Sequence, residues 1–249
     1  MAATLLNGED GPVVLLNDDG RSLYVLIAEH ASNRLPRTLG TLGLPDTELQ
    51  RHIAWDIGAE QVARRLSQRI DAPLVLQRYS RLAYDCNRPP DSPDAMPEVS
   101  ETTDIPGNRN LTPADRLART REIYRPFHTA IAELLDQRAA EGVRSAVVTI
   151  HSFTPVYKGK ARTVELGILH DRDTRLADKL FGSFPGVDTR LNEPYGPEDG
   201  VLHTLNLHAA PRRLEHVMIE MRNDLISDER GQDEWADRLS ASLARAASH

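Results

Sequence analysis

Four short apolar runs constrain the fold of this chain more than any other feature. They span residues 24–28 (YVLIA), 73–77 (PLVLQ), 146–150 (AVVTI) and 216–220 (HVMIE). Each run is rich in Val, Ile or Leu and lacks polar alternation, which is typical of strands that are covered on both faces. A weaker run of the same kind spans 163–169 (TVELGIL). The runs predict a sheet buried between two layers.

Helical patterns separate these strands. Apolar side chains recur at the spacing of one helix face in residues 46–70. Residues 112–141 begin with Thr112 and a proline, a typical cap and first position of a helix. Two further helices are expected at 174–184 and 232–247. Alternating strands and helices indicate an α/β fold, a single domain over 1–249 with a mixed, largely parallel sheet and helices on both faces.

Composition narrows the class of protein. The chain has 249 residues and a formal net charge of −7, so it lacks the basic excess that nucleic-acid binding requires. Its one cysteine, Cys86, has no intrachain partner, which fits a reducing compartment. The first residues do not resemble a signal peptide, and no run reaches the roughly 18 apolar residues of a membrane span. We expect a cytoplasmic protein that binds neither nucleic acid nor membrane; the sequence does not indicate its oligomeric state.

One connection is unusually long. Residues 88–110 (RPPDSPDAMPEVSETTDIPGNRN) are rich in Pro, Asp and Ser. Loops of this length inside a compact domain are uncommon and are usually functional or mobile. We expect this segment to act as an active-site lid rather than as a domain boundary.

Residues able to do chemistry follow three of the predicted strands. His30 comes after the first run, His151 and Ser152 after the third, and Glu220 ends the fourth. A single histidine at a strand end is most often a polar residue at the border of the core. Ligands gather at the carboxyl ends of strands in open α/β sheets, however, and two histidines with a carboxylate there fit metal ligands and a catalytic base. Catalytic zinc takes three protein ligands and keeps one position open.

The third metal ligand is less clear from the sequence. Asp56 stands among apolar residues, where a carboxylate is costly unless it is paired or bound to a metal. It could equally be a surface or capping residue of an amphipathic helix. Glu29 and Asn33 are alternative ligands close to His30.

Arginines near these positions suggest an acidic substrate. The candidates are Arg81, Arg88, Arg109 and Arg222. Arginine binds carboxylates with two parallel hydrogen bonds. The alternative is that Arg81 or Arg88 pairs within the protein, with Asp85, Asp91 or Asp94 as partners.

Two further histidines leave more than one interpretation. His203 and His208 could line a site, cap a helix or bond to backbone. The chain has neither the G-x-S-x-G motif of many serine hydrolases nor a glycine-rich phosphate loop.

Seven motifs in order between about residues 24 and 235 carry a resemblance to a known family. They are EHASNRLP, HIAWDIGA, YSRLAYDCNRP, VSETTDIPGNRNL, IYRPFHTAI, IHSFTPV and IEMRNDL. Together they resemble the N-formylglutamate amidohydrolase family, which is distantly similar to zinc carboxypeptidases. The resemblance implies a phosphorylase/hydrolase-like α/β fold and a metal-dependent amide hydrolase.

The resemblance also implies roles for individual residues. His30 and His151 take the metal-binding positions, Glu220 takes the position of the general base, and the Asn87-Arg88 pair takes that of a substrate-carboxylate clamp. Zinc carboxypeptidases carry a glutamate ligand three residues after the first histidine, where this chain has Asn33. An amide is a poor zinc ligand, so the carboxylate must come from elsewhere, and Asp56 is our choice.

The expected reaction is hydrolysis of N-formylglutamate to formate and glutamate with one divalent metal ion, Zn²⁺. The expected partner is a small substrate with one or two carboxylates. The expected substrate-binding residues are Arg81, Asn87, Arg88, Arg109, Ser152 and Arg222. One alternative is an amidohydrolase acting on another N-acyl amino acid or a small peptide. A second is an inactive homologue that binds a ligand.

Overall fold

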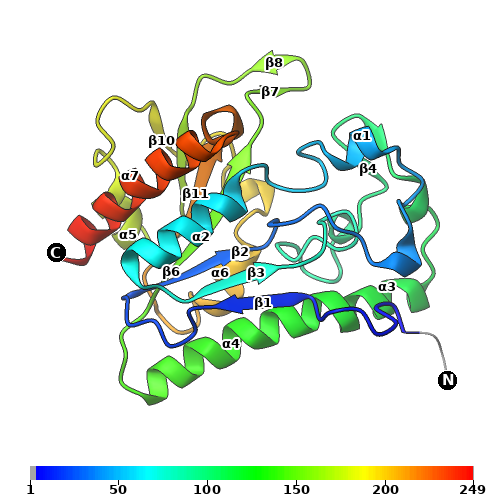
Figure 1. Ribbon diagram of the computed structural model, residues 1–249, viewed down its shortest axis with the longest axis horizontal. Helices are drawn as coiled ribbons and strands as arrows, with labels where there is room; N and C mark the ends of the chain where they lie inside the picture. Colours follow the sequence, from blue (N-terminus) through cyan, green and yellow to red (C-terminus); the bar gives the residue numbers. More distant parts are fainter. Residues whose placement is uncertain (1–3, 249) are drawn as a thin grey trace.

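A seven-stranded sheet runs through the computed structural model, which describes residues 4–248 (Figure 1). Its strands, in sheet order, are β1 (Val13–Leu16), β3 (Leu74–Gln77), β2 (Tyr24–Ala28), β6 (Ala146–Phe153), β11 (His216–Arg222), β9 (Leu166–Leu169) and β10 (Thr189–Leu191). The four neighbours β3, β2, β6 and β11 are mutually parallel. β1 and β9 run antiparallel to β3 and β11, and β10 is parallel to β9. The mixed, largely parallel sheet is confirmed.

All five predicted strands are present, with small shifts of their ends. β6 continues to Phe153, so His151 lies inside the strand rather than after it. The sequence did not reveal β1 and β10, the two edge strands. Both are short and only partly buried, so neither shows the fully apolar pattern of the central strands.

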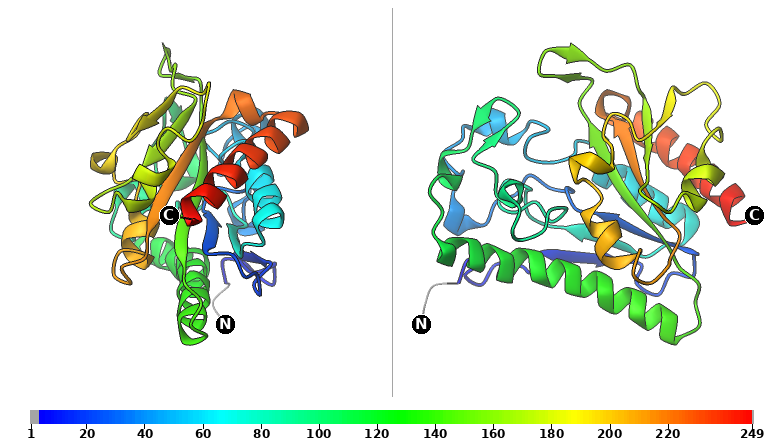
Figure 2. Two further views of the ribbon diagram at one scale, coloured as in Figure 1. Left: turned by 90° about the vertical axis from the view of Figure 1, so that its left-hand side faces the viewer. Right: turned by 180° about the vertical axis from the view of Figure 1, so that it is seen from behind.

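Helices cover both faces of the sheet, as predicted. On one face lie α2 (Ala59–Ile70), α5 (Arg175–Leu180) and α7 (Glu229–Ala247), with α2 and α7 side by side in Figure 1. On the other lie α4 (Arg125–Ala140) and α6 (His203–His208), seen from behind in Figure 2. Successive strand residues point to opposite faces, so Leu26 packs in the core under α2 and Ile27 in the core under α4. No helix within residues 4–248 is long and apolar enough to cross a membrane.

The predicted helix at 112–141 is present but has an irregular turn. Thr112 caps α3 (Pro113–Arg119) through a reciprocal pair of hydrogen bonds with Asp115. A π-helical turn at Thr120–Tyr124 then leads into α4. Such turns are frequent near functional sites.

The prediction of one helix at 46–70 was wrong. The structure has a single turn, α1 (Asp46–Leu49), then irregular chain, then α2 from Ala59. Gly58 precedes α2 with a φ of 80°, and a side chain there would collide with the carbonyl oxygen of Ile226. The apolar residues between the helices, such as Ile53 and Ala54, are buried because this irregular chain packs into the core. Asp56 therefore lies in a turn and not on a helix.

The long segment 88–110 has structure of its own. It contains two short 3-10 turns (Pro93–Ala95 and Pro106–Asn108) and a hairpin of β4 (Val99–Ser100) and β5 (Thr103–Asp104). A second hairpin, β7 (Val156–Tyr157) and β8 (Lys160–Ala161), follows β6. The backbone N–H of Lys158 donates to Glu101 Oε1 at 3.1 Å, so the two hairpins are linked beyond the carboxyl end of the sheet.

Candidate active site

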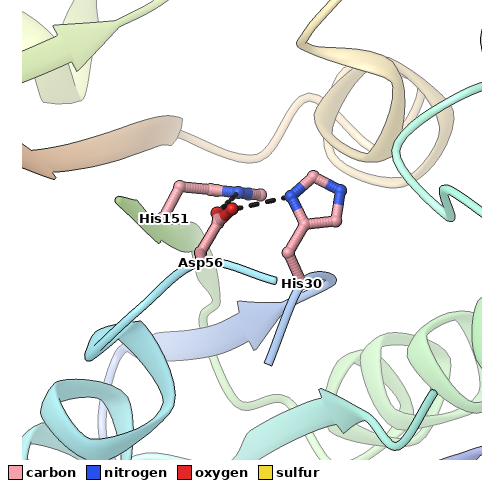
Figure 3. A group of neighbouring side chains, drawn as sticks. All are labelled: His30, Asp56 and His151. Atoms are coloured by element: carbon pink, nitrogen blue, oxygen red, sulfur yellow. Dashed lines mark hydrogen bonds and ion pairs between the residues drawn. The ribbon is translucent and has the colours of Figure 1, made fainter. Parts of the chain in front are cut away.

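Two histidines and an aspartate meet at the carboxyl ends of β2 and β6 (Figure 3). Asp56 Oδ2 lies 2.9 Å from His151 Nδ1 and 3.3 Å from His30 Nδ1. The backbone N–H of Asp56 donates to the His30 carbonyl at 2.9 Å, which fixes the turn that delivers the carboxylate. All three residues are buried, and one donor atom from each lies within 4.8 Å of the others. The group fits the donor set of a catalytic zinc site, two imidazole nitrogens and one carboxylate oxygen.

A second carboxylate faces the far nitrogen of each histidine. Asp85 Oδ1 lies 2.7 Å from His30 Nε2. Glu29 Oε2 lies 2.9 Å from His151 Nε2, although the contact is not aligned as a hydrogen bond. A carboxylate at Nε2 favours the tautomer with its proton there, and this leaves the Nδ1 lone pair free for a metal. Both imidazoles thus direct Nδ1 toward Asp56 Oδ2, where a metal ion could be bound by all three atoms.

The electrostatics of this group favour positive charge. Burial opposes the charged form of His151, but Glu29 and Asp56 outweigh it and raise the pKa of His151 well above its usual value. The pKa of His30 is also raised, because Asp85 and Asp56 outweigh burial and the charge of Arg81. Despite burial, the two histidines lower the pKa of Asp56. The same carboxylates would also stabilise the positive charge of a bound cation.

The geometry favours Asp56 over the other two candidates for the third ligand. Asn33 is directed elsewhere, and its Nδ2 donates to the Leu49 carbonyl at 2.9 Å. Glu29 faces the side of His151 opposite Asp56. Neither belongs to the group of donor atoms around Asp56.

Glu220 lies beside this group on the neighbouring strand. β11 pairs in parallel with β6 so that Glu220 is directly opposite His151. The carboxyl is 5% exposed, and its Oε2 has no hydrogen-bond partner among the described residues. Burial raises the pKa of Glu220 to about 7. A buried carboxyl with this pKa and a free oxygen can accept a proton near neutral pH.

A glycine on the other side of β11 makes room for Glu220. Gly167 of β9 pairs with Glu220, and a Cβ on Gly167 would lie 3.2 Å from the Glu220 Cβ. It would also collide with the carbonyl oxygen of Glu193. Gly167 therefore lets the chain before Tyr195 pass close to the strand that carries the candidate base.

A cavity of about 280 Å³ opens onto His30, Asp56 and His151, which we call the metal-type group. The expected site residues that line it are His30, Asp56, Arg81, Asn87, Arg88, His151, Ser152 and Glu220. Ser100 and Glu101 of the 88–110 segment also line it. A small concave cavity with convergent polar groups is typical of a site for a small molecule.

Arg81 and Arg88 differ in their partners. Arg81 pairs with Asp85 at 2.9 Å and Asp56 at 3.4 Å, so the alternative of pairing within the protein holds for this residue. Arg88 Nη1 donates to the carbonyls of Asn87 and Gly200, both at 2.9 Å. Its Nε and Nη2 hydrogen bond to none of the residues between 4 and 248, so two donors remain for a ligand.

Asn87 and Ser152 line the cavity, and their side chains also hydrogen bond to backbone groups. Asn87 Nδ2 donates to the Val201 carbonyl, and its Oδ1 accepts from the Thr204 N–H at 3.1 Å. Ser152 Oγ donates to the Ile57 carbonyl at 2.8 Å, next to the turn that carries Asp56. Both residues therefore fix the walls of the cavity.

The structure does not bring Arg109 and Arg222 into the cavity lining. Arg109 follows an exposed turn and pairs with Asp104 at 2.9 Å. Arg222 Nε donates to Asp224 at 2.8 Å, and its Nη1 donates to the Thr163 carbonyl at 2.9 Å. Both guanidinium groups are occupied by the protein itself, which the sequence spacing could not reveal.

His203 and His208 belong to a different buried group, which also contains Tyr124 and His128. His203 Nε2 lies 2.8 Å from the Tyr124 hydroxyl, and His208 Nε2 lies 2.8 Å from His128 Nδ1. None of these four residues lines the cavity.

Two residues of the site carried too weak a signal in the sequence. Asp85 stands two residues before Asn87 and was weighed only as a partner for an arginine. Tyr195 lines the cavity from a loop after β10, in a stretch without an apolar pattern or a motif. Its position depends on the packing of that loop against β9.

Comparisons with known proteins agree with the fold. Gene product Atu2144 of Agrobacterium tumefaciens, of known crystal structure, is 52% identical, with a TM-score of 0.95 over 96% of each chain. The N-formylglutamate amidohydrolase of Ralstonia eutropha is 18% identical, with a TM-score of 0.72 over 96% of this chain and 98% of that one, and shares the fold. No curated protein matched the sequence.

The family comparison covers most of the chain. The family model described as N-formylglutamate amidohydrolase matches residues 22–227, a range that contains every residue of the metal-type group, Glu220 and Arg88. The chain therefore belongs to the N-formylglutamate amidohydrolase family.

Proposed function

We propose that the protein hydrolyses the amide bond of an N-formyl amino acid, with N-formylglutamate as the expected substrate and one divalent metal ion as cofactor. The observation that carries this proposal is the buried His30, Asp56 and His151 group beside Glu220 in a small cavity. Membership of the amidohydrolase family supports the class of reaction.

The three donor residues would hold the metal, for which zinc is our expectation. A divalent ion at this position would polarise the substrate carbonyl and lower the pKa of a bound water. Asp85 and Glu29, at the far nitrogens of the histidines, keep both rings oriented toward it.

Glu220 is our candidate for the general base. Its unpartnered Oε2 takes a proton from the attacking water as the water oxygen bonds to the formyl carbon. The carboxyl then passes this proton to the leaving nitrogen as the carbon–nitrogen bond breaks. The products are formate and the free amino acid.

Arg88 and Arg81 would each bind a different polar group of the substrate. The free Nε and Nη2 of Arg88 suit the α-carboxylate, and its Nη1 is held by backbone carbonyls. Arg81 is fixed by Asp56 and Asp85 beside the metal-type group, where it can stabilise negative charge on the carbonyl oxygen.

The 88–110 segment suits the role of a lid. Glu101 lines the cavity, pairs with Arg51 at 2.7 Å and accepts from the Lys158 N–H of the opposite hairpin. Closure of the two hairpins over a substrate would exclude water from the reaction.

Metal analysis combined with an assay tests the proposal. We expect about one divalent ion per chain, release of formate from N-formylglutamate, and loss of turnover with a chelator that zinc restores. A panel that varies the acyl group and the side chain would identify a different N-acyl substrate. Absence of turnover with the whole panel in metal-loaded protein would indicate an inactive, ligand-binding homologue instead.

A further inference from the structure

A second histidine group, made of Tyr124, His128, His203 and His208, takes no part in the proposed mechanism. Its rings pack against one another, with neighbouring centres between 4.2 Å and 5.9 Å apart. Tyr124 ends the π-helical turn and His128 lies in α4, whereas His203 and His208 are the first and last residues of α6. The group therefore joins α6 to α4.

The hydrogen bonds of this group fix the tautomers of His128 and His208. A carbonyl oxygen can only accept, so His128 Nε2 donates to the Cys86 carbonyl, 2.9 Å away. His128 Nδ1 then has a free lone pair and accepts from His208 Nε2 at 2.8 Å. Burial lowers the pKa of His128 to about 3 and that of His208 to about 4, so both rings are neutral at neutral pH. A hydrogen-bond chain of fixed direction thus ends on the backbone at Cys86.

The other pair of the group holds the first residue of α6. The Tyr124 hydroxyl and His203 Nε2 lie 2.8 Å apart. Burial lowers the pKa of His203 and raises that of Tyr124 to about 12, so both groups are uncharged at neutral pH. Because His203 begins α6, this hydrogen bond fixes the position of the helix start.

The start of α6 is also where the side chains of Asn87 and Arg88 are held. Asn87 Nδ2 donates to the Val201 carbonyl, and its Oδ1 accepts from the Thr204 N–H at 3.1 Å. Arg88 Nη1 donates to the Gly200 carbonyl at 2.9 Å. These backbone groups flank the first residue of α6, and they orient the pair so that Nε and Nη2 of Arg88 stay available to a ligand.

The second histidine group therefore acts on the Asn87-Arg88 pair from two directions. His128 bonds to the carbonyl of the residue immediately before Asn87. Tyr124 holds the residue immediately before Thr204, whose N–H bonds to Asn87. Binding residues keep a productive geometry only when the residues behind them lock their positions.

We propose that the second histidine group positions the Asn87-Arg88 pair for a carboxylate of the substrate. In this role it sets the affinity for the substrate and leaves metal binding and the proton transfer at Glu220 unaffected. The inference rests on the proposed function, in which Arg88 binds the substrate carboxylate, and it identifies the residues on which that contact depends.

Removal of single hydroxyl groups tests the inference. Tyr124→Phe keeps the ring but loses the hydrogen bond to His203. For the metal-loaded variant we expect KM for N-formyl-L-glutamate to rise about 3- to 10-fold, the effect of one lost neutral hydrogen bond, with kcat within about 2-fold and the metal content unchanged. Tyr84→Phe is the matched control and should keep the wild-type KM. The Tyr84 ring lies 5.2 Å from that of Tyr124, and its buried hydroxyl has no hydrogen-bond partner among residues 4–248.

Two further comparisons separate positioning from general packing. His203→Gln retains a polar atom for the Tyr124 hydroxyl and should stay close to the wild-type KM, whereas His203→Leu should match Tyr124→Phe. In an Arg88→Gln background, Tyr124→Phe should raise KM no further, because the arginine that it positions is absent. Additive effects of the two substitutions would place the action of Tyr124 elsewhere and overturn the inference.

Hydrogen exchange gives a readout without turnover. The Thr204 N–H donates to Asn87 Oδ1, so a displaced helix start should expose it to solvent. In metal-loaded protein without ligand, we expect its exchange to be about 3- to 10-fold faster in Tyr124→Phe and unchanged in Tyr84→Phe. If no substrate is hydrolysed but exchange at Thr204 becomes faster, the proposed reaction fails and the positioning role stands. Equal exchange in both variants, or an unchanged KM in Tyr124→Phe, overturns the positioning role without affecting the proposed reaction.

Discussion

Within residues 4–248, the protein has two buried groups of histidines, and only one of them lies at the candidate active site. In the metal-type group, the rings of His30 and His151 have centres 5.0 Å apart. In the second group, the rings of His128 and His208 have centres 5.1 Å apart. The spacing and the burial are alike, but the partners differ. His30 and His151 contact carboxylates, whereas His128 contacts the Cys86 carbonyl and the other histidine.

The difference indicates that the neighbouring carboxylates, and not the histidines by themselves, make a buried histidine pair favourable for positive charge. Burial lowers the pKa of His128 to about 3 and that of His208 to about 4, and the neighbouring histidine or arginine lowers each further. Burial also disfavours the charged form of His151, but Glu29 and Asp56 outweigh it and raise its pKa. A histidine pair without carboxylates is held neutral and serves packing, and the same pair with carboxylates attracts positive charge.

Replacing Asp56 should have the largest effect, because it removes the carboxylate shared by both histidines. We expect Asp56→Asn to lose its metal on dialysis and to lose activity by at least about 1,000-fold, since a catalytic metal contributes several kcal/mol. Metal content and formate release measure the two effects. Asp104→Asn, an exposed aspartate paired with Arg109, is the control and should keep both. Full metal content in Asp56→Asn would show that the histidines alone define the site.

Replacing Glu220 should separate catalysis from metal binding. Glu220→Gln keeps the shape of the side chain but cannot accept the proton, so kcat should fall by about 10²- to 10⁴-fold. Metal content should be unchanged, because Glu220 is not among the three donor residues. The exposed Glu234→Gln provides the baseline. Normal turnover in Glu220→Gln would exclude this residue as the base.

Replacing Glu29 tests whether a carboxylate at the far nitrogen of a histidine contributes to metal affinity. Glu29→Gln should weaken zinc affinity about 10- to 100-fold while the three ligands remain in place. Competition with a zinc-binding dye measures the affinity directly, without an assay of turnover. A matching loss is expected for Asp85→Asn, which removes the equivalent partner of His30. Unaltered affinity in both variants would reduce these carboxylates to a role in folding.

The central part of the fold could be predicted from the sequence. The four parallel strands are buried on both faces, so their apolar runs were continuous, and His30, His151 and Glu220 lie where these runs end. The edge strands β1 and β10 escaped notice because they are half-buried. The irregular chain between α1 and α2 resembled a helix, because its residues are buried for tertiary reasons and only Gly58 indicates the turn.

The site was predictable only where it depends on strand ends. Asp56 was chosen on chemical grounds and lies beside both histidines, but its position depends on a hydrogen bond to the His30 backbone, which no local pattern encodes. The partners of the arginines could not be predicted from the sequence either, because they also depend on tertiary contacts. Arg109 and Arg222 are near the predicted site residues along the chain, yet nearby acidic side chains bind them.

The last prediction concerns the second histidine group, which should make the protein sensitive to acid. His128 and His208 have lowered pKa values in the folded protein and values near 6.5 when unfolded, so the unfolded chain binds more protons below about pH 6.5. Stability is therefore complete above pH 6.5 and falls as the pH drops toward 4, by up to about 1.4 kcal/mol per pH unit for each histidine. Urea unfolding of the metal-free protein between pH 7 and pH 4 measures this slope. His128→Gln should flatten it, and a slope equal to that of the wild type would mean that this pair is already charged in the folded state.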